Sequence, residues 1–165
     1  MISMVRNRDN MIKLTSQRGT VTTQHILLRP AAHRGADMPN PLQILIVDDS
    51  DVTRRILSTI VRSRHWAVCG EAEDGWSAIR KFQELKPDLV LLDLAMPDIN
   101  GIEVARMMTG LDPTVPIILF TVMNLEGLED AARRAGVYAV VSKAQSWDLV
   151  KSIETAAAQS QRLIQ

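Results

Sequence analysis

The sequence predicts an α/β domain in which a parallel five-stranded sheet lies between two layers of helices. Five short apolar runs alternate with segments whose apolar residues recur at helical spacing. The runs are almost continuously apolar, which is typical of strands that are buried on both faces. Strands of this kind, each followed by a helix, form doubly wound parallel sheets.

The predicted elements alternate regularly from residue 42 onward. Strands are expected at residues 43–47, 66–72, 89–92, 116–120 and 137–141. Helices are expected after Ser50 and at residues 76–86, 102–109, 125–135 and 147–158. Pro87 ends the second helix and Gly136 ends the fourth, whereas Ser50 is placed to cap the first. The apolar face of the first helix is expected to contain Val52, Ile56, Ile60 and Val61.

Residues 1–40 differ in composition from the remainder of the chain. They mix Arg, Asn, Thr, Gln and Met and end among prolines, so we expect a disordered or weakly ordered extension before a domain at residues 41–162. Only residues 21–28 are expected to form a strand or a helical turn. Two alternatives remain open for the extension: translation starts at Met38, or the basic segment contacts a partner.

Composition limits the class of protein and its partners. The 165 residues are 46% apolar and carry no net charge, so neither DNA binding nor membrane binding is expected. Six basic and two acidic residues fall in residues 1–37, which leaves 13 basic and 17 acidic residues in a mildly acidic domain. No run is long enough to span a bilayer and no signal peptide is evident. Cys69 is the single cysteine, which favours a reducing compartment and hence the cytoplasm.

Polar residues stand where the predicted strands end. Asp48 and Asp49 follow the first strand, and Asp93 follows the third. Thr121 and Lys143 follow the fourth and fifth strands. Because the carboxyl ends of parallel strands share one edge of the sheet, these five residues are expected to converge where open α/β sheets bind ligands.

The chemistry of this group is that of phosphoryl transfer to a carboxylate. Three converging carboxylates repel one another unless a cation is present, and hard oxygen ligands suit Mg²⁺. An aspartate can attack phosphorus to form an acyl phosphate, while a lysine and a threonine hydroxyl stabilise the phosphoryl oxygens. Each residue alone has an ordinary explanation, such as a helix cap or a turn. Their joint occurrence at one edge favours a functional site.

These motifs resemble the receiver domains of two-component response regulators. The resemblance is carried by Leu42–Ser50, Asp88–Glu103, Pro116–Thr121 and Lys143, and it extends over about residues 42–160. The segment DLAMPDINGIE is the most diagnostic part. The resemblance implies the flavodoxin-like (βα)5 fold with strand order 2-1-3-4-5. Within the family, the chain is similar to receivers that are joined to helix-turn-helix output domains.

The resemblance also implies a role for each site residue. Asp93 would be the phosphoacceptor, phosphorylated by a sensor histidine kinase or a phosphotransfer protein. Lys143 would contact the phosphoryl group, and Thr121 would swing toward it. Pro97 and Gly101 would shape the loop that follows. The implied Mg²⁺ ligands are Asp48, Asp49, Asp93 and the backbone carbonyl of Ala95.

Three positions depart from the commonest family pattern. Val140 stands where an aromatic switch residue is usual, and Tyr138 is expected on the same strand face because it is two residues away. Ala144 replaces the proline that usually follows the lysine, so a cis peptide is less expected there. Val122 is bulkier than the residue that commonly follows Thr121.

The leading hypothesis is a single-domain response regulator whose phosphorylation changes its affinity for a protein effector. The chain ends soon after the last predicted helix, so output is expected in trans rather than through an attached enzyme or DNA-binding domain. A pseudo-receiver that acts only as an interaction module is the alternative. A phosphohydrolase is disfavoured because Ala95 stands where its acid/base aspartate would be, so no turnover enzyme is expected. The kinase, the effector and homodimerisation are left open.

Overall fold

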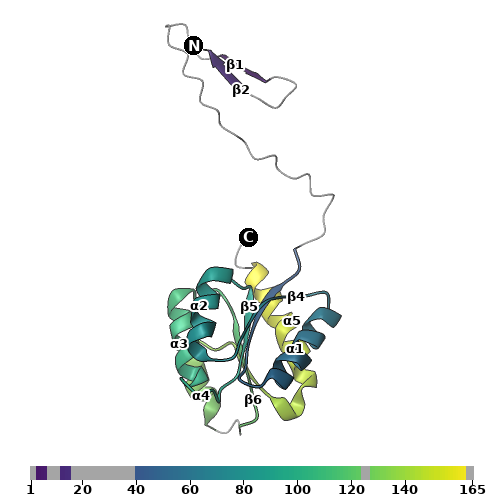
Figure 1. Cartoon of the computed structure of the whole chain (residues 1–165), viewed down its shortest axis with the longest axis vertical. Helices are drawn as coiled ribbons and strands as arrows, with labels where there is room; N and C mark the ends of the chain where they lie inside the picture. The colour runs from purple at the N-terminus through teal and green to yellow at the C-terminus, as the bar shows by residue number, and fades with distance from the viewer. Residues whose placement is uncertain (1–2, 7–11, 16–39, 124–126, 163–165) are drawn as a thin grey trace. The chain divides into compact units, whose positions relative to one another are not determined.

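A computed structural model describes residues 3–6, 12–15, 40–123 and 127–162 (Figure 1). The chain divides into two compact units, Met1–Met38 and Pro39–Gln165. In the first unit, strands β1 (Ser3–Arg6) and β2 (Ile12–Thr15) pair in antiparallel fashion. This strand pair was not expected from the sequence, and the element expected at residues 21–28 lies outside the described residues.

The second unit has the predicted topology, a parallel sheet in the order β4-β3-β5-β6-β7. In the order of the chain, this is strand order 2-1-3-4-5. Its strands are β3 (Gln43–Val47), β4 (Ala67–Ala72), β5 (Leu89–Leu92), β6 (Ile117–Thr121) and β7 (Ala139–Ser142). Its α-helices are α1 (Asp51–Ser63), α2 (Gly75–Leu85), α3 (Gly101–Leu111), α4 (Leu128–Arg134) and α5 (Trp147–Arg162). None of the helices in the described residues is long and apolar enough to cross a membrane.

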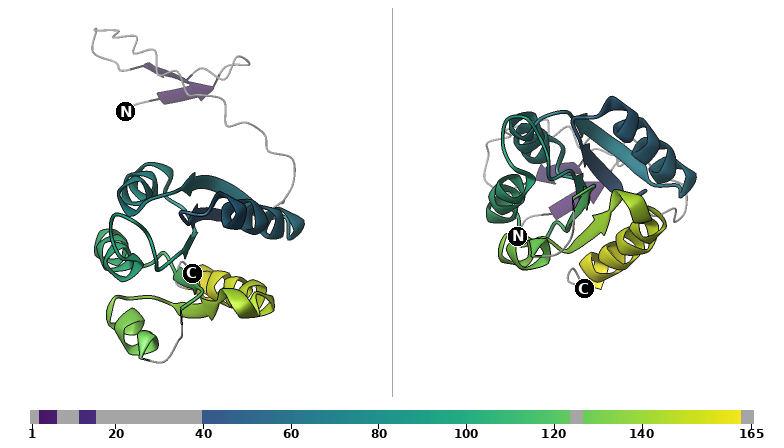
Figure 2. Two further views of the ribbon diagram at one scale, coloured as in Figure 1. Left: turned by 60° about the horizontal axis from the view of Figure 1, so that its bottom comes forward. Right: turned by 90° about the horizontal axis from the view of Figure 1, so that it is seen from below.

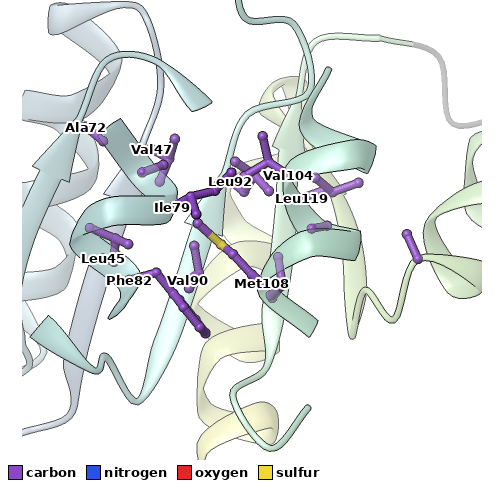
Figure 3. Close-up of a cluster of buried hydrophobic side chains, with 14 of the residues drawn as sticks. Leu45, Val47, Ala72, Ile79, Phe82, Val90, Leu92, Val104, Met108 and Leu119 are labelled. Atoms are coloured by element: carbon purple, nitrogen blue, oxygen red, sulfur yellow. The ribbon is translucent and has the colours of Figure 1, made fainter. Parts of the chain in front are cut away.

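Helices cover both faces of the sheet, as Figures 1 and 2 show. Helices α2, α3 and α4 lie on one side, and α1 and α5 lie on the other. Each layer encloses its own core. The first core includes Leu45, Val90 and Met108 (Figure 3), and the second includes Ile44 and Leu91. Successive residues of a strand thus enter opposite cores, which explains why the central strands are continuously apolar.

Polar side chains cap the helices that begin at the carboxyl edge of the sheet. The Ser50 hydroxyl accepts a hydrogen bond from Thr53 N at 3.3 Å, and Asp74 Oδ1 accepts one from Ser77 N at 2.7 Å. Asn100 Oδ1 does the same for a backbone N–H of α3 at 2.8 Å. These caps satisfy N–H groups that have no partner within the helix, so each strand passes into its helix through a defined turn.

The face by which α1 packs differs from the prediction. The helix buries Leu57, Ser58 and Val61, whereas Val52 and Ile56 are 66% and 55% exposed. The prediction for Val52 and Ile56 was wrong because the helix carries two apolar stripes. The stripe through Leu57 also brings the small Ser58 against the sheet, where its hydroxyl donates to a carboxylate of β4 at 2.8 Å.

Candidate functional site

Three carboxylates meet where β3 and β5 end. The two strands are neighbours in the sheet, with Val47 paired to Leu92, so the residues that follow them lie side by side. Asp48, Asp49 and Asp93 each offer a carboxylate oxygen, and these atoms all lie within 4.8 Å of one another. Asp48 and Asp93 are only 1% and 4% exposed, whereas Asp49 faces solvent. The predicted acidic cluster is therefore assembled as the sheet topology requires.

Lys143 reaches this cluster from the end of β7, the edge strand that lies two strands away from β5 in the sheet. It begins a short 3₁₀ turn, Lys143–Gln145, after β7, and its Nζ lies 6.0 Å from the centre of the Phe120 ring of β6. The ammonium donates to Asp48 Oδ2 at 2.7 Å and lies 3.1 Å from Asp93 Oδ1. Burial lowers the pKa of Lys143, but its contacts with the Asp48 and Asp93 carboxylates and their negative charges outweigh this and raise the pKa. One lysine thus bridges two buried acids.

The two buried aspartates are not equally well paired. Asp48 Oδ1 accepts a hydrogen bond from Ser50 N at 2.9 Å, and its other oxygen accepts one from Lys143. Asp93 Oδ1 is buried and forms the ion pair with Lys143, but it has no hydrogen-bond partner within the described part of the chain. Burial raises the pKa of Asp93, opposed by Lys143 and reinforced by the charge of Asp48. Of the two buried aspartates, Asp93 would therefore be stabilised more by a new cation or hydrogen-bond donor.

The donor set fits a hard divalent cation. Among the described residues, three carboxylates face a single ammonium, so the cluster keeps an excess of negative charge that a divalent ion would offset. Carboxylate oxygens are the ligands that such ions take in proteins. Ala95 is exposed in the loop after β5, and its carbonyl as a further ligand stays a prediction.

Thr121 lies at the same edge as the acids. It is the last residue of β6 and is fully buried, two residues beyond Leu119, the partner of Leu92 in β5. Its Oγ1 accepts a hydrogen bond from Met123 N at 3.2 Å. This contact uses a lone pair of the oxygen and does not occupy the hydroxyl proton.

The loop after Asp93 is held at two points. Gly101 N donates to Leu94 O at 3.0 Å, and a Cβ on Gly101 would lie 2.2 Å from the carbonyl oxygen of Asp93. The Asp98 carboxylate accepts hydrogen bonds from Gly75 N and Trp76 N, both at 3.1 Å. Partial desolvation raises the pKa of Asp98, but these backbone bonds outweigh it and lower the pKa. The loop is thereby fastened to the start of α2 as well as to α3.

The family of the chain follows from comparison with known proteins. Residues 44–154 match the response regulator receiver domain. The chain belongs to this family. The receiver is 33% identical to the chemotaxis protein CheY of Listeria monocytogenes over 117 residues, which cover 70% of this chain and 98% of that protein.

Solved receiver structures have the same fold. A LuxR-family response regulator from Aurantimonas is 31% identical, with a TM-score of 0.69 over 72% of this chain and 86% of that chain. The CheX–CheY–BeF3–Mg complex of Borrelia burgdorferi includes a chain that is 25% identical, with a TM-score of 0.67 over 70% of this receiver and 88% of that chain.

The packing of Tyr138 and Val140 differs from the expectation. Val140 packs against the core beneath α2 and α3, whereas Tyr138 packs against the core beneath α1 and α5. The expectation that they share a face was wrong because Tyr138 precedes β7, which begins at Ala139, and strict alternation holds only within a strand. Val122 is 73% exposed. The described residues contain no cis peptide bond.

Sequence reasoning missed two residues that shape the site. Asp98 bonds to the start of α2, 22 and 23 residues away in the chain, and no local pattern signals such a contact. Arg54 lies near the start of α1 and donates to the backbone carbonyl of Asp48. A signal for Arg54 was present, because the positive end of a helix dipole disfavours a cation that has no compensating partner.

Replacing Gly101 by alanine is expected to disturb the backbone of Asp93. The added methyl would overlap the Asp93 carbonyl, so we expect a loss of about 1–3 kcal/mol in the free energy of unfolding. Amide resonances near Asp93 should shift. Gly110→Ala, in the same helix, is the control, because its Cβ would meet nothing within 4 Å; it should stabilise by up to about 1 kcal/mol. Equal effects of the two variants in urea denaturation would contradict this explanation.

Replacing Asp93 by asparagine is expected to stabilise the metal-free protein at pH 7. The pKa of Asp93 is raised in the folded state, so its ionised form weakens the fold at pH values above that pKa. As the pH falls below the ordinary aspartate pKa of about 3.9, the carboxyl becomes neutral in both states and the advantage of Asp93→Asn should vanish. Denaturation curves across this range measure the difference. A wild type that is the more stable protein at pH 7 would refute the expected sign.

Proposed function

We propose that this receiver accepts a phosphoryl group on Asp93, with Mg²⁺ held by Asp48, Asp49 and Asp93. The observation that carries the proposal is the state of the Asp93 carboxylate. It is buried within an acidic cluster, and its Oδ1 lies 3.1 Å from an ammonium yet has no hydrogen-bond partner among the described residues. Such a group gains by acquiring both a cation and a covalent partner.

The chemistry requires positioning and charge neutralisation more than acid–base catalysis. A carboxylate oxygen of Asp93 attacks phosphorus and forms an O–P bond as the bond from phosphorus to the donor breaks. The donor is a phosphohistidine or a small acyl phosphate, and it keeps the electron pair of the broken bond. A histidine donor takes up a proton from solvent on the released ring nitrogen, whereas an acyl phosphate leaves as an ionised carboxylate. The Lys143 ammonium already contacts Asp48 and Asp93, so it can pair with a phosphoryl oxygen as negative charge develops there. Bound Mg²⁺ would neutralise charge on the transferred group.

We further propose that Thr121 couples this event to an effector in trans. Its oxygen accepts a bond from Met123 N, while its proton can be donated to a phosphoryl oxygen. A shift of Thr121 toward Asp93 would therefore pull on the segment that follows β6. Val122 and Met123 in that segment are 73% and 52% exposed, so a change there alters the surface available to a partner protein.

The proposed phosphodonor is a sensor histidine kinase or a phosphotransfer protein. Any protein donor must cover the carboxyl edge of the sheet to reach Asp93. Large apolar side chains flank that edge: Val52 and Ile56 in the first two turns of α1, and Trp147, 70% exposed, at the start of α5. Exposed apolar groups beside a reaction site favour contact with a partner protein.

A pseudo-receiver remains the second candidate, because Val140 fills the usual aromatic position with a partly buried side chain packed on the core. The Mg²⁺ and BeF3 in the Borrelia complex suggest a probe that would distinguish the two candidates. A switching receiver should show shifts in amide resonances of α4, β7 and α5 on addition of both, and a pseudo-receiver only at the acidic cluster. The absence of enzymatic turnover and of DNA binding, and a cytoplasmic location, stay predictions.

Incubation with acetyl phosphate and Mg²⁺ tests the acceptor directly. We expect a mass increase of one phosphoryl group that is lost in Asp93→Asn and when Mg²⁺ is chelated, because the reaction needs both the carboxylate and the cation. Asp148→Asn removes an exposed aspartate in the first turn of α5 and is the matched control, which should label like wild type. Labelling that survives Asp93→Asn would rule out Asp93 as the acceptor.

A charge placed on α1 should separate protein donors from small ones. Ile56→Asp puts a carboxylate on the exposed apolar stripe, so transfer from a histidine kinase that phosphorylates the wild type should slow at least about tenfold. Labelling by acetyl phosphate should stay within about twofold, because the acidic cluster is untouched. Leu111→Asp, at the end of α3, is the control for an exposed apolar position away from this edge. Equal kinase rates for the two variants would contradict donor contact with α1.

A further inference from the structure

The Arg54 side chain binds the backbone of Asp48 and Asp49, the acidic pair that follows β3. It lies near the start of α1, and its side chain is only 13% exposed. Nη1 donates to the carbonyl oxygen of Asp48 at 2.8 Å and to that of Asp49 at 3.3 Å. A single guanidinium nitrogen therefore contacts the two consecutive peptide groups whose side chains carry the candidate metal ligands.

The guanidinium of Arg54 is itself held by carboxylates on two elements. Its Nε lies 3.6 Å from Glu71 Oε2 in β4, and its Nη2 lies 3.4 Å from Asp51 Oδ1 in α1. The other oxygen of Glu71 accepts a hydrogen bond from the buried Ser58 hydroxyl at 2.8 Å. The planar fork of an arginine matches such a set of acceptors, whereas a lysine supplies a single point charge.

These contacts matter because of where the two peptide groups lie. Asp48 and Asp49 form the turn between β3 and α1, and a rotation of either peptide group would swing its carboxylate. The Asp48 carboxylate accepts a hydrogen bond from Ser50 N, so its direction depends on the shape of the same turn. The positive charge of Arg54 also partly offsets the repulsion among the acids.

We propose that Arg54 is a positioning residue for the acidic pair, fixing the Asp48–Asp49 turn so that both carboxylates are aimed at the cation site before the ion arrives. Arg54 touches neither the cation nor the phosphoryl group and acts through the two backbone carbonyls. Glu71 supports it by holding the guanidinium. The consequence for cation affinity rests on the proposed function, whereas the consequence for the turn does not.

Arg54→Ala and Arg55→Ala form a matched pair that tests this role. Both remove one positive charge from neighbouring positions of α1, and both arginines pair with Asp51. The Arg55 side chain is 78% exposed and pairs with Asp51 at 2.8 Å. Its loss therefore leaves the hydrogen bonds from Arg54 to the Asp48 and Asp49 carbonyls in place. Isothermal titration of each full-length protein with Mg²⁺ alone should show affinity about tenfold or more weaker for Arg54→Ala, the usual size for loss of a group that orients ligands. Arg55→Ala should stay within about twofold of wild type.

Hydrogen exchange of the Ser50 amide in the metal-free protein supplies a readout that does not depend on the cation. This amide donates to Asp48 Oδ1, so it reports the shape of the turn directly. We expect exchange about tenfold faster in Arg54→Ala and unchanged in Arg55→Ala. Arg54→Lys and Glu71→Gln should show smaller changes in the same direction, and they serve if Arg54→Ala fails to fold.

The outcomes separate the two proposals. A wild type that does not bind Mg²⁺ would count against the proposed function. The Ser50 exchange rates would still test whether Arg54 fixes the Asp48–Asp49 turn. A wild type that binds Mg²⁺, with equal affinity and equal Ser50 exchange in Arg54→Ala and Arg55→Ala, would overturn the positioning role alone. A uniform rise in exchange across the domain of Arg54→Ala would mark general destabilisation and would also overturn it.

Discussion

The contact of Lys143 with Asp48 and Asp93 is the interaction on which the site depends. Two carboxylates at the ends of adjacent strands are almost completely buried, which is unfavourable unless charge of opposite sign is close. The ammonium supplies that charge at 2.7 and 3.1 Å. This compensation is incomplete, since one oxygen of Asp93 has no hydrogen-bond partner in the residues that the structure describes. The same burial that weakens the metal-free fold supports the proposal that Asp93 binds a cation and accepts a phosphoryl group.

The surroundings of the acids are built to keep them in place. The parallel sheet fixes Asp48 and Asp93 side by side, and short capped turns lead from the strands into the helices. Gly101 lets α3 begin directly against the backbone of Asp93. Arg54 and Asp98 fasten the two loops that carry the acids to neighbouring elements. Fixed polar groups of this kind stabilise developing charge without a cost of reorganisation during the reaction.

Acceptance of a phosphoryl group and its transmission have different structural support. The groups for acceptance converge at one edge of the sheet. The proposed transmission relies on Thr121 and the exposed residues after it, while the usual aromatic position holds Val140 on the core beneath α2 and α3. A valine there cannot swing between exposed and buried positions as a large ring can, because its side chain is short and stiff. In the proposed mechanism, the switch therefore depends on movement of the backbone after Thr121.

The sequence by itself determined the fold class, the order of the elements and the acids that converge, because buried parallel strands have a distinctive pattern and all end at one edge. It did not determine which stripe of α1 is buried, since Ile56 and Leu57 are equally apolar and only packing beside Ser58 and Glu71 selects between them. It also could not reveal the contacts of Arg54 and Asp98. Those contacts join backbone groups to side chains on other elements, and only the tertiary structure brings them within hydrogen-bonding distance.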